Sequence, residues 1–123
     1  MLELKNINVS FRSERQDKIF GHTRQQVLFD VSLTVKEGTC LGILGESGSG
    51  KSTLMNILGC LDIPTYGDYH LDGVDVTELT DRQLAHIRNK QIGFIFQGFN
   101  LIPALNAWEN VELPLIYQGI PFY

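Results

Sequence analysis

One stretch of the sequence decides the fold: Gly45-Glu46-Ser47-Gly48-Ser49-Gly50-Lys51-Ser52-Thr53. It fits the phosphate-binding pattern G-x-x-x-x-G-K-[ST]. Glycines let the backbone curve closely enough for successive N–H groups to point into one concavity. That concavity, together with the N-terminus of the following helix, holds negative charge. The stretch, here called the phosphate loop, therefore predicts a binding site for a nucleoside triphosphate.

Three side chains at the end of the phosphate loop have distinct expected roles. Lys51 would reach the β- and γ-phosphates of the nucleotide. Ser52 stands where a hydroxyl can ligate Mg²⁺, an ion that usually binds through few protein oxygens plus water and substrate phosphates. Thr53 would add a phosphate contact.

The sequence around the phosphate loop agrees with this prediction. A phosphate loop should follow a buried strand and open a helix. Residues 39–44 form a short apolar run that predicts such a strand, and residues 52–58 are compatible with a helix. A glycine-rich hairpin turn is the alternative interpretation, but it gives no reason for Gly-Lys-Ser-Thr to run into an apolar helix.

Length and composition narrow the class of protein. The 123 residues allow one small domain, at a length where roughly two-thirds of the unfolded surface can be buried. A net charge of -4 and a pI near 5.2 argue against a nucleic-acid partner, because nucleic-acid binders normally present a basic face. Cys40 and Cys60 lack metal-ligand spacing and are predicted to be two buried thiols. The chain has no membrane-span-like run and no signal peptide, which predicts a cytosolic protein.

Alternating apolar residues predict strands on both sides of a polar segment. Residues 2–9 and, more cleanly, residues 27–35 alternate and precede the phosphate loop. The polar residues 12–26 between them predict a solvated loop, whose basic side chains are either plain surface or a cluster that steers phosphate. A further strand is expected at residues 69–73, after a turn.

Helix signals and a second apolar run follow. Thr80 and Gln83 have capping-box spacing, with Leu79 and Leu84 spaced as a hydrophobic staple. Residues 92–96 form a near-continuous apolar run, as expected of a strand buried on both faces, and the run ends at Gln97.

A third helix is expected to start at Asn106. Glu109, three residues on, supplies a second capping box. Pro114 should limit or kink this helix, because a proline in a helix interior removes a hydrogen bond.

With these elements in order, the chain resembles the N-terminal half of an ATP-binding cassette (ABC) transporter ATPase subunit. Residues 28–38 resemble the family's lead-in to the phosphate loop, and residues 93–97 resemble its Q-loop. The sequences of residues 55–62, 99–103 and 109–115 most resemble the lipoprotein-release and macrolide-export branch. Ile19-Phe20-Gly21 and Gly45-Glu46-Ser47-Gly48 look more like the peptide and nickel importer branch.

The resemblance implies a fold class and a division of the chain. The expected fold is α/β: a partial P-loop NTPase core of the ABC ATPase type, with an antiparallel β edge and the start of a helical subdomain. Residues 1–96 would be the N-terminal part of the nucleotide-binding core, and residues 97–123 the Q-loop and the start of the helical subdomain. The C-terminal half of the ATPase would be absent.

The resemblance also implies roles for site residues and names ATP and Mg²⁺ as ligands. Phe11 is expected to stack on adenine, although Phe20 competes for this role and Phe11 could simply pack in the core. Gln97 would sense Mg²⁺ and the attacking water and link the site to the membrane partner. Lys51 and Gln97 are thus the residues expected to take part in catalysis, and Ser52 and Gln97 those expected at the metal.

The implied function is that of an ATP-binding subunit coupling ATP binding and hydrolysis to transmembrane transport. It would work with a transmembrane permease subunit and a second ATPase subunit, on the cytoplasmic side of the plasma membrane. The family's LSGGQ-type signature, second acidic strand end and switch histidine are not found, so this chain should bind nucleotide better than it hydrolyses it.

Two rival interpretations remain open. A self-contained P-loop kinase or GTPase should carry a base-recognition motif such as Asn-Lys-x-Asp, which is not present. An inactive, self-associating fragment would follow from an unpaired sheet edge and uncovered apolar surface. The apolar side chains after Gln97 would serve either as a docking surface or as packing against further sequence: Phe99, Leu101, Ile102, Leu105 and Trp108.

Overall fold

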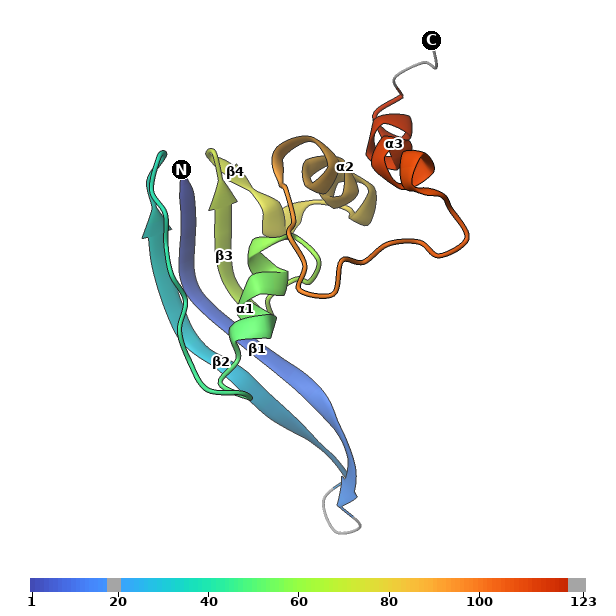
Figure 1. Cartoon of the computed structure of the whole chain (residues 1–123). Coiled ribbons are helices and arrows are strands. Elements are labelled where there is room, and N and C mark those ends of the chain that lie inside the picture. The colour runs from blue at the N-terminus through green and yellow to red at the C-terminus, as the bar shows by residue number, and fades with distance from the viewer. Residues whose placement is uncertain (18–20, 120–123) are drawn as a thin grey trace.

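The computed structural model describes residues 1–17 and 21–119, with the side chains of 12–17 and 21–24 left out. Four strands, three α-helices and a short 3₁₀ helix follow one another along this part of the chain (Figure 1). In chain order the elements are β1 (Leu2–Asp17), β2 (Gly21–Val35), α1 (Lys51–Leu58), β3 (Tyr66–Leu71), β4 (Val74–Asp75), η1 (Val76–Glu78), α2 (Asp81–Gln91) and α3 (Ala107–Tyr117).

The strands form one antiparallel sheet in the order β2-β1-β3-β4. β1 pairs with β3 from Leu2, opposite Leu71, to Asn8, opposite Tyr66. Beyond Asn8, β1 pairs with β2 alone, and the two strands leave the body of the molecule as a long hairpin (Figure 1).

The prediction of a loop over residues 12–26 is therefore wrong for the backbone that the structure describes. The polar composition correctly indicates that this segment lies outside the core. A two-stranded ribbon outside the core can, however, be polar on both faces and still form a hydrogen-bonded ladder. Phe20, the competitor of Phe11, lies outside the described residues.

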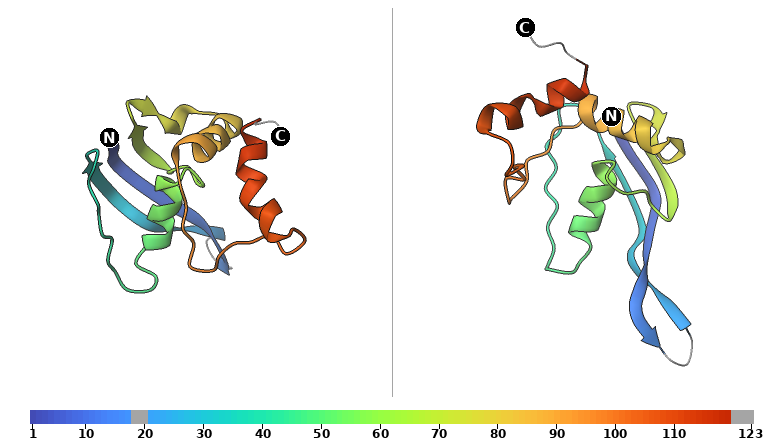
Figure 2. Two further views of the ribbon diagram at one scale, coloured as in Figure 1. Left: turned by 45° about the horizontal axis from the view of Figure 1, so that its top comes forward. Right: turned by 90° about the vertical axis from the view of Figure 1, so that its right-hand side faces the viewer.

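The core forms where α1 packs on one face of the sheet (Figure 2). The strands contribute Leu4, Ile7, Val9, Leu28 and Tyr69, all buried. The helical and connecting segments contribute Ile57, Cys60, Val76, Leu84 and Ile87. The predicted helix after the phosphate loop is confirmed, and its apolar side anchors the loop to the sheet.

Both predicted capping boxes are confirmed. At α2, the Gln83 backbone N–H donates to the Thr80 hydroxyl at 3.3 Å, and the Thr80 N–H donates to the Gln83 side chain at 2.9 Å. Of the expected staple, Leu84 lies in the core cluster, and Leu79 is partly buried and packs against that cluster. Local spacing thus predicted where this helix begins.

α3 has the same kind of N-terminus but stands apart from the sheet. The Glu109 N–H donates to the Asn106 side chain at 2.8 Å, and no residue of the helix is buried. The helix runs on past Pro114 to Tyr117, so this proline does not end it. The Asn89 side chain ties α3 to α2 by donating to the Pro114 carbonyl at 3.0 Å.

Two predicted strands are not strands in this structure. Residues 39–44 and 92–96 have no regular secondary structure, and Leu44 and Ile95 are almost fully exposed. A strand needs a neighbouring ladder, and no described strand lies beside these apolar segments to provide one. Cys40 is exposed for the same reason, which corrects the prediction of two buried thiols.

Cys60 is buried as predicted, and this burial raises the pKa of its thiol against the opposing effect of Arg88. None of the helices in the described ranges is both long and apolar enough to cross a bilayer.

Candidate functional site

The phosphate loop connects residues 39–44 to α1 through two left-handed glycines. Gly48 has φ 83° and Gly50 has φ 95°, backbone angles that favour glycine. The Ser49 N–H donates to the Glu46 carbonyl at 3.1 Å, which closes a turn inside the loop. The Leu54 N–H donates to the Gly50 carbonyl at 2.9 Å and starts the helix.

Close contacts also favour glycine at two positions of the loop. A Cβ added at Gly50 would lie 2.9 Å from Leu28 Cδ2 and 3.3 Å from the Val27 carbonyl oxygen, so the loop rests directly on β2. A Cβ added at Gly45 would lie 2.5 Å from Ser49 Oγ. A side chain at Gly50 would therefore push the loop away from β2, whereas one at Gly45 would first displace the Ser49 side chain.

The N-terminus of α1 is open to an anion. Gly50 provides no side-chain cap, and the first turn contains no acidic residue. The first N–H groups of a helix lack intrahelical partners and carry partial positive charge. The backbone cradle and this uncapped helix end together fit a phosphate group.

The side chains of the loop stand around this cradle. The Lys51 ammonium donates a hydrogen bond to the carbonyl of Gly45, the first residue of the loop. Ser52 is exposed, and Thr53 is half-buried within the helix. Four further loop residues are exposed as well: Glu46, Ser47, Gly48 and Ser49.

The donor set for a metal is limited to oxygen atoms of this loop and its surroundings. Among the described residues, no cluster of three or more histidine, cysteine or acidic side chains could hold a metal ion. Mg²⁺ fits such a site, because it usually takes only one or two protein ligands and completes its shell with waters and phosphates. The exposed Ser52 hydroxyl is a suitable ligand of this kind.

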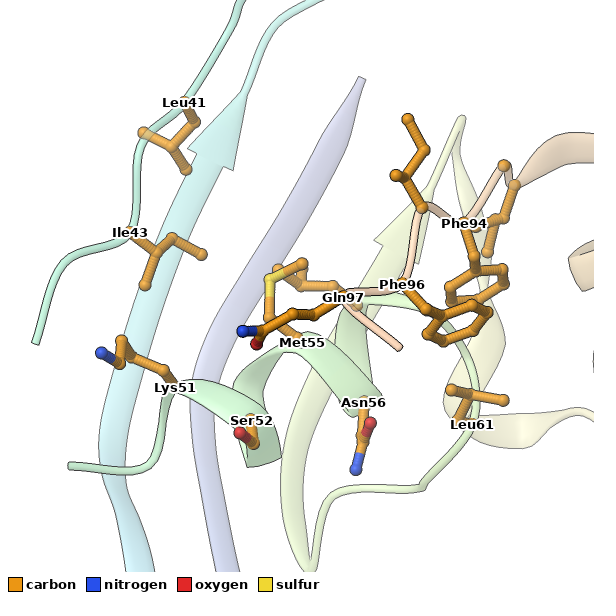
Figure 3. Close-up of a pocket in the computed structure, with 15 residues that line it drawn as sticks. Leu41, Ile43, Lys51, Ser52, Met55, Asn56, Leu61, Phe94, Phe96 and Gln97 are labelled. Atoms are coloured by element: carbon orange, nitrogen blue, oxygen red, sulfur yellow. The ribbon is translucent and has the colours of Figure 1, made fainter. Parts of the chain in front are cut away.

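A cleft of about 700 Å³ brings the predicted Gln97 to the same place. It lies between the side chains of Leu41 and Ile43, helix α1 and residues 92–97, and Lys51, Ser52 and Gln97 all line it (Figure 3). The structure therefore brings together residues expected at the phosphates and the metal, although Ser52 and Gln97 lie 45 positions apart in the sequence.

Other lining residues were missed by sequence reasoning. Met55 and Asn56 line the cleft from α1, and Phe94 and Phe96 line it from the opposite segment. Met55 and Asn56 follow Ser52 by three and four positions, so they share its side of the helix. That spacing could have identified Met55 and Asn56 as lining residues. Nothing in the local sequence indicated which side of residues 92–97 would face the helix.

Phe11 lies on β1 just beyond the core. It is 44% exposed and pairs with Gln25 of β2. Val9, two residues earlier on β1, pairs with Leu28, the residue that Gly50 contacts. Phe11 thus lies about 7 Å further along β1 than Val9, which marks where the phosphate loop meets the sheet. Its aromatic ring is partly exposed there.

The phosphate loop, the helix that it opens and the antiparallel hairpin sheet together define a P-loop nucleotide-binding module. This chain belongs to the ABC transporter family, because the family model described as ABC transporter matches residues 28–120.

Curated relatives agree with this family. The chain is 48% identical over 120 residues to the ABC transporter ATP-binding protein YknY of Bacillus subtilis, an alignment that covers 98% of this chain and 49% of YknY. It is also 48% identical over 118 residues to the macrolide export ATP-binding/permease protein MacB of Bdellovibrio bacteriovorus, covering 96% of this chain and 17% of that protein. The chain thus spans about half the length of YknY.

Solved structures of one cassette resemble the fold. The dimeric structure of the ABC transporter cassette MJ0796, a protein of Methanocaldococcus jannaschii, matches with a TM-score of 0.85 at 46% identity, covering 96% of this chain and 48% of that chain. A post-hydrolysis structure of MJ0796 bound to ADP and Pi matches with a TM-score of 0.87 at 45% identity, covering 100% of this chain and 50% of that chain. The expected fold class, a partial ABC ATPase core with an antiparallel edge, is confirmed.

Proposed function

We propose that this chain binds ATP with Mg²⁺ at residues 45–53, as the N-terminal part of the ATP-binding subunit of an ABC transporter. One observation carries the proposal: the glycine cradle opens onto an uncapped helix N-terminus in a cleft that Lys51, Ser52 and Gln97 share. Backbone N–H groups and a helix end form a suitable site for a triphosphate.

Each side chain has a part in this proposal. Lys51 has three N–H donors and donates one hydrogen bond to the Gly45 carbonyl, so two donors remain for the β- and γ-phosphates. Ser52 offers its exposed hydroxyl to Mg²⁺, which would neutralise the charge of the phosphates when bound. Gln97 offers an amide that can contact the metal or an attacking water, and Phe11 offers a ring for adenine.

The test is calorimetric titration of the chain with ATP and Mg²⁺, beside a Lys51→Ala variant. Removing the ammonium takes away a charge-assisted contact to phosphate, so the affinity should fall at least about tenfold. Phosphate release is assayed in the same samples. Unfolding of both chains is followed by circular dichroism, so that loss of binding is not confused with loss of structure.

Each outcome has a distinct meaning. Binding that depends on Lys51, without turnover, supports a site that needs further protein to hydrolyse ATP. Turnover above background would instead favour a self-contained P-loop enzyme. If the folded chain does not bind ATP at all, the proposed site is wrong.

For the whole protein, we propose that ATP binding and hydrolysis drive transport across a membrane. The relatives named above as ATP-binding and ATP-binding/permease proteins support this proposal. Residues 1–96 would belong to the nucleotide-binding core, and residues 97–123 to the Q-loop and the helical subdomain. A second ATPase subunit and a permease subunit would be its partners on the cytoplasmic side of the plasma membrane.

The permease would dock on the apolar side chains that follow Gln97. Phe99, Leu101, Ile102 and Trp108 are exposed, and Leu105 is half-buried. Exposed apolar patches rich in aromatic residues commonly mark protein interfaces.

A further inference from the structure

The segment that carries Gln97 is held on α1 by side chains. In the described part of the chain, residues 93–97 make no backbone hydrogen bond with another residue. Within the described residues, side-chain packing is therefore what holds this segment against α1. Its two phenylalanines lie on one side, with Phe94 and Phe96 stacked at 5.4 Å between ring centroids and 2° between planes. Ile95, between them, faces away and is exposed.

The Phe94 ring rests on a glycine at the end of α1. A Cβ added at Gly59 would lie 2.5 Å from Phe94 Cε1 and 2.8 Å from Phe94 Cζ. Contacts below 3.0 Å between such atoms require something to move, and here the Phe94 ring, which stacks on Phe96, would have to shift. Gly59 therefore permits the approach of this segment to the helix.

Backbone conformation does not explain the glycine at this position. Gly59 has φ -81° and ψ 4°, which any residue can adopt. The left-handed residue that ends α1 is the next one, Cys60, with φ 58°. Helices usually place glycine at that left-handed position. Here the glycine stands one residue earlier, where the added methyl group of alanine would meet the Phe94 ring.

Gln97 follows this aromatic pair directly and faces the start of the same helix. Figure 3 shows Gln97 above α1, on the side where Lys51, Ser52 and Met55 lie, while Phe94 and Phe96 cover the other end of the cleft. A displacement of the ring at Gly59 can move the segment that carries Gln97, because no backbone hydrogen bond to a described residue holds residues 93–97 in place.

We propose that Gly59 is a positioning residue for Gln97. The absence of a side chain at Gly59 admits the Phe94 ring, and this contact holds the segment that presents the Gln97 amide to Ser52 and Lys51. The inference rests on the proposed binding of ATP with Mg²⁺, and it adds a residue that does not itself touch the ligand.

The test compares ATP affinity in Mg²⁺ with ATP affinity in EDTA for three chains: wild type, Gly59→Ala and the matched control Gly42→Ala. Gly42 has open space within 4 Å of its added Cβ and a φ outside the left-handed region. Displacing a metal-site partner typically weakens metal affinity about tenfold or more, so the Mg²⁺-dependent gain in affinity should fall by about that factor in Gly59→Ala. The affinity in EDTA, which reports the phosphate cradle, should change less than about twofold.

A rescue and a second variant guard against a trivial loss of folding. Gly59→Ala combined with Phe94→Leu should regain the Mg²⁺-dependent gain, because the shorter side chain leaves room for the alanine methyl group. Phe94→Ala introduces no clash but removes the anchor, so it should lose the gain as well. Circular dichroism of each chain confirms that it is folded.

The possible results separate the two proposals. If the wild type does not bind ATP, the proposed function fails. If the wild type binds with a Mg²⁺-dependent gain and both Gly59→Ala and Phe94→Ala keep it, Gly59 does not position Gln97. Equal losses with Mg²⁺ and with EDTA, or a double variant no better than Gly59→Ala, would also overturn the inference.

Discussion

At the scale of single residues, Tyr69 ties the sheet to the end of the helix behind the phosphate loop. It is 1% exposed, and its hydroxyl donates to the carbonyl of Leu58, the last residue of α1, at 2.7 Å. Burial raises the pKa of the Tyr69 phenol, with a smaller contribution from Cys60. A deprotonated phenol could not donate this hydrogen bond, so the contact depends on the protonated form.

This geometry predicts a loss of stability in alkali. Above the ordinary tyrosine pKa of about 10, the unfolded chain releases a proton that the folded chain retains, so the free energy of unfolding falls as the pH rises. Tyr69→Phe removes this effect. The variant should lose about 1 kcal/mol at pH 8, through the missing hydrogen bond, and should then fall less steeply than the wild type above pH 10. Urea unfolding between about pH 8 and pH 11 measures both quantities.

Tyr66→Phe is the matched control for this prediction. Tyr66 also lies in β3 but is 72% exposed, so its removal should leave both the stability and its pH dependence close to those of the wild type. Parallel stability curves for Tyr69→Phe and the wild type would contradict the prediction.

At the scale of the elements, one glycine decides how β1 and β3 meet. Gly67 in β3 has φ 110°, and an added Cβ would lie 2.4 Å from the Asn6 carbonyl oxygen and 2.7 Å from that of Lys5. The β1–β3 register shifts between Lys5 and Asn8, opposite this glycine. The bulge in β1 therefore fits only against a residue without a side chain.

Gly67→Ala should lower the free energy of unfolding by about 2 to 4 kcal/mol, because backbone strain and a clash with backbone atoms act together. Gly73→Ala is the control, since Gly73 has φ 81° but open space within 4 Å of its added Cβ. Gly73→Ala introduces the backbone strain without the clash, so it should lower the free energy of unfolding by less. Urea unfolding of both variants distinguishes the terms, and equal losses would mean that the approach to β1 does not matter.

Helix starts illustrate what could be read locally at this scale. The two capping boxes at Thr80 and Asn106 were predicted correctly because their partners lie three residues apart. The β1–β2 hairpin beyond Asn8 was missed because its pairing joins polar residues far from the core, where composition carries no signal of a ladder.

At the scale of the whole molecule, apolar surface is left uncovered. The segments at residues 39–44 and 92–97 expose Leu44 and Ile95, and α3 exposes Trp108 and Val111. Apolar patches of this kind favour association. We expect the isolated chain to self-associate as its concentration rises.

Ile95→Lys should weaken this association, because a charge in an apolar contact must be desolvated. Val74→Lys, which changes an exposed valine of β4 on another part of the molecule, should leave it unchanged. Sedimentation velocity over a series of concentrations measures the effect. A wild-type chain that stays monomeric throughout, or equal behaviour of the two variants, would contradict the prediction.

The phosphate loop, the helix after it and both capping boxes could be predicted from spacing alone, since each depends on groups within a few residues of one another. Those local rules also identified Lys51 and Ser52 as residues to examine, whereas Gln97 came from the resemblance to the ABC family. Their arrangement in one cleft, the contact between Gly59 and Phe94, and the exposure of residues 39–44 could not be predicted in this way. Each depends on which distant segments pack together, because burial and strand pairing are properties of neighbours in space and not of neighbours along the chain.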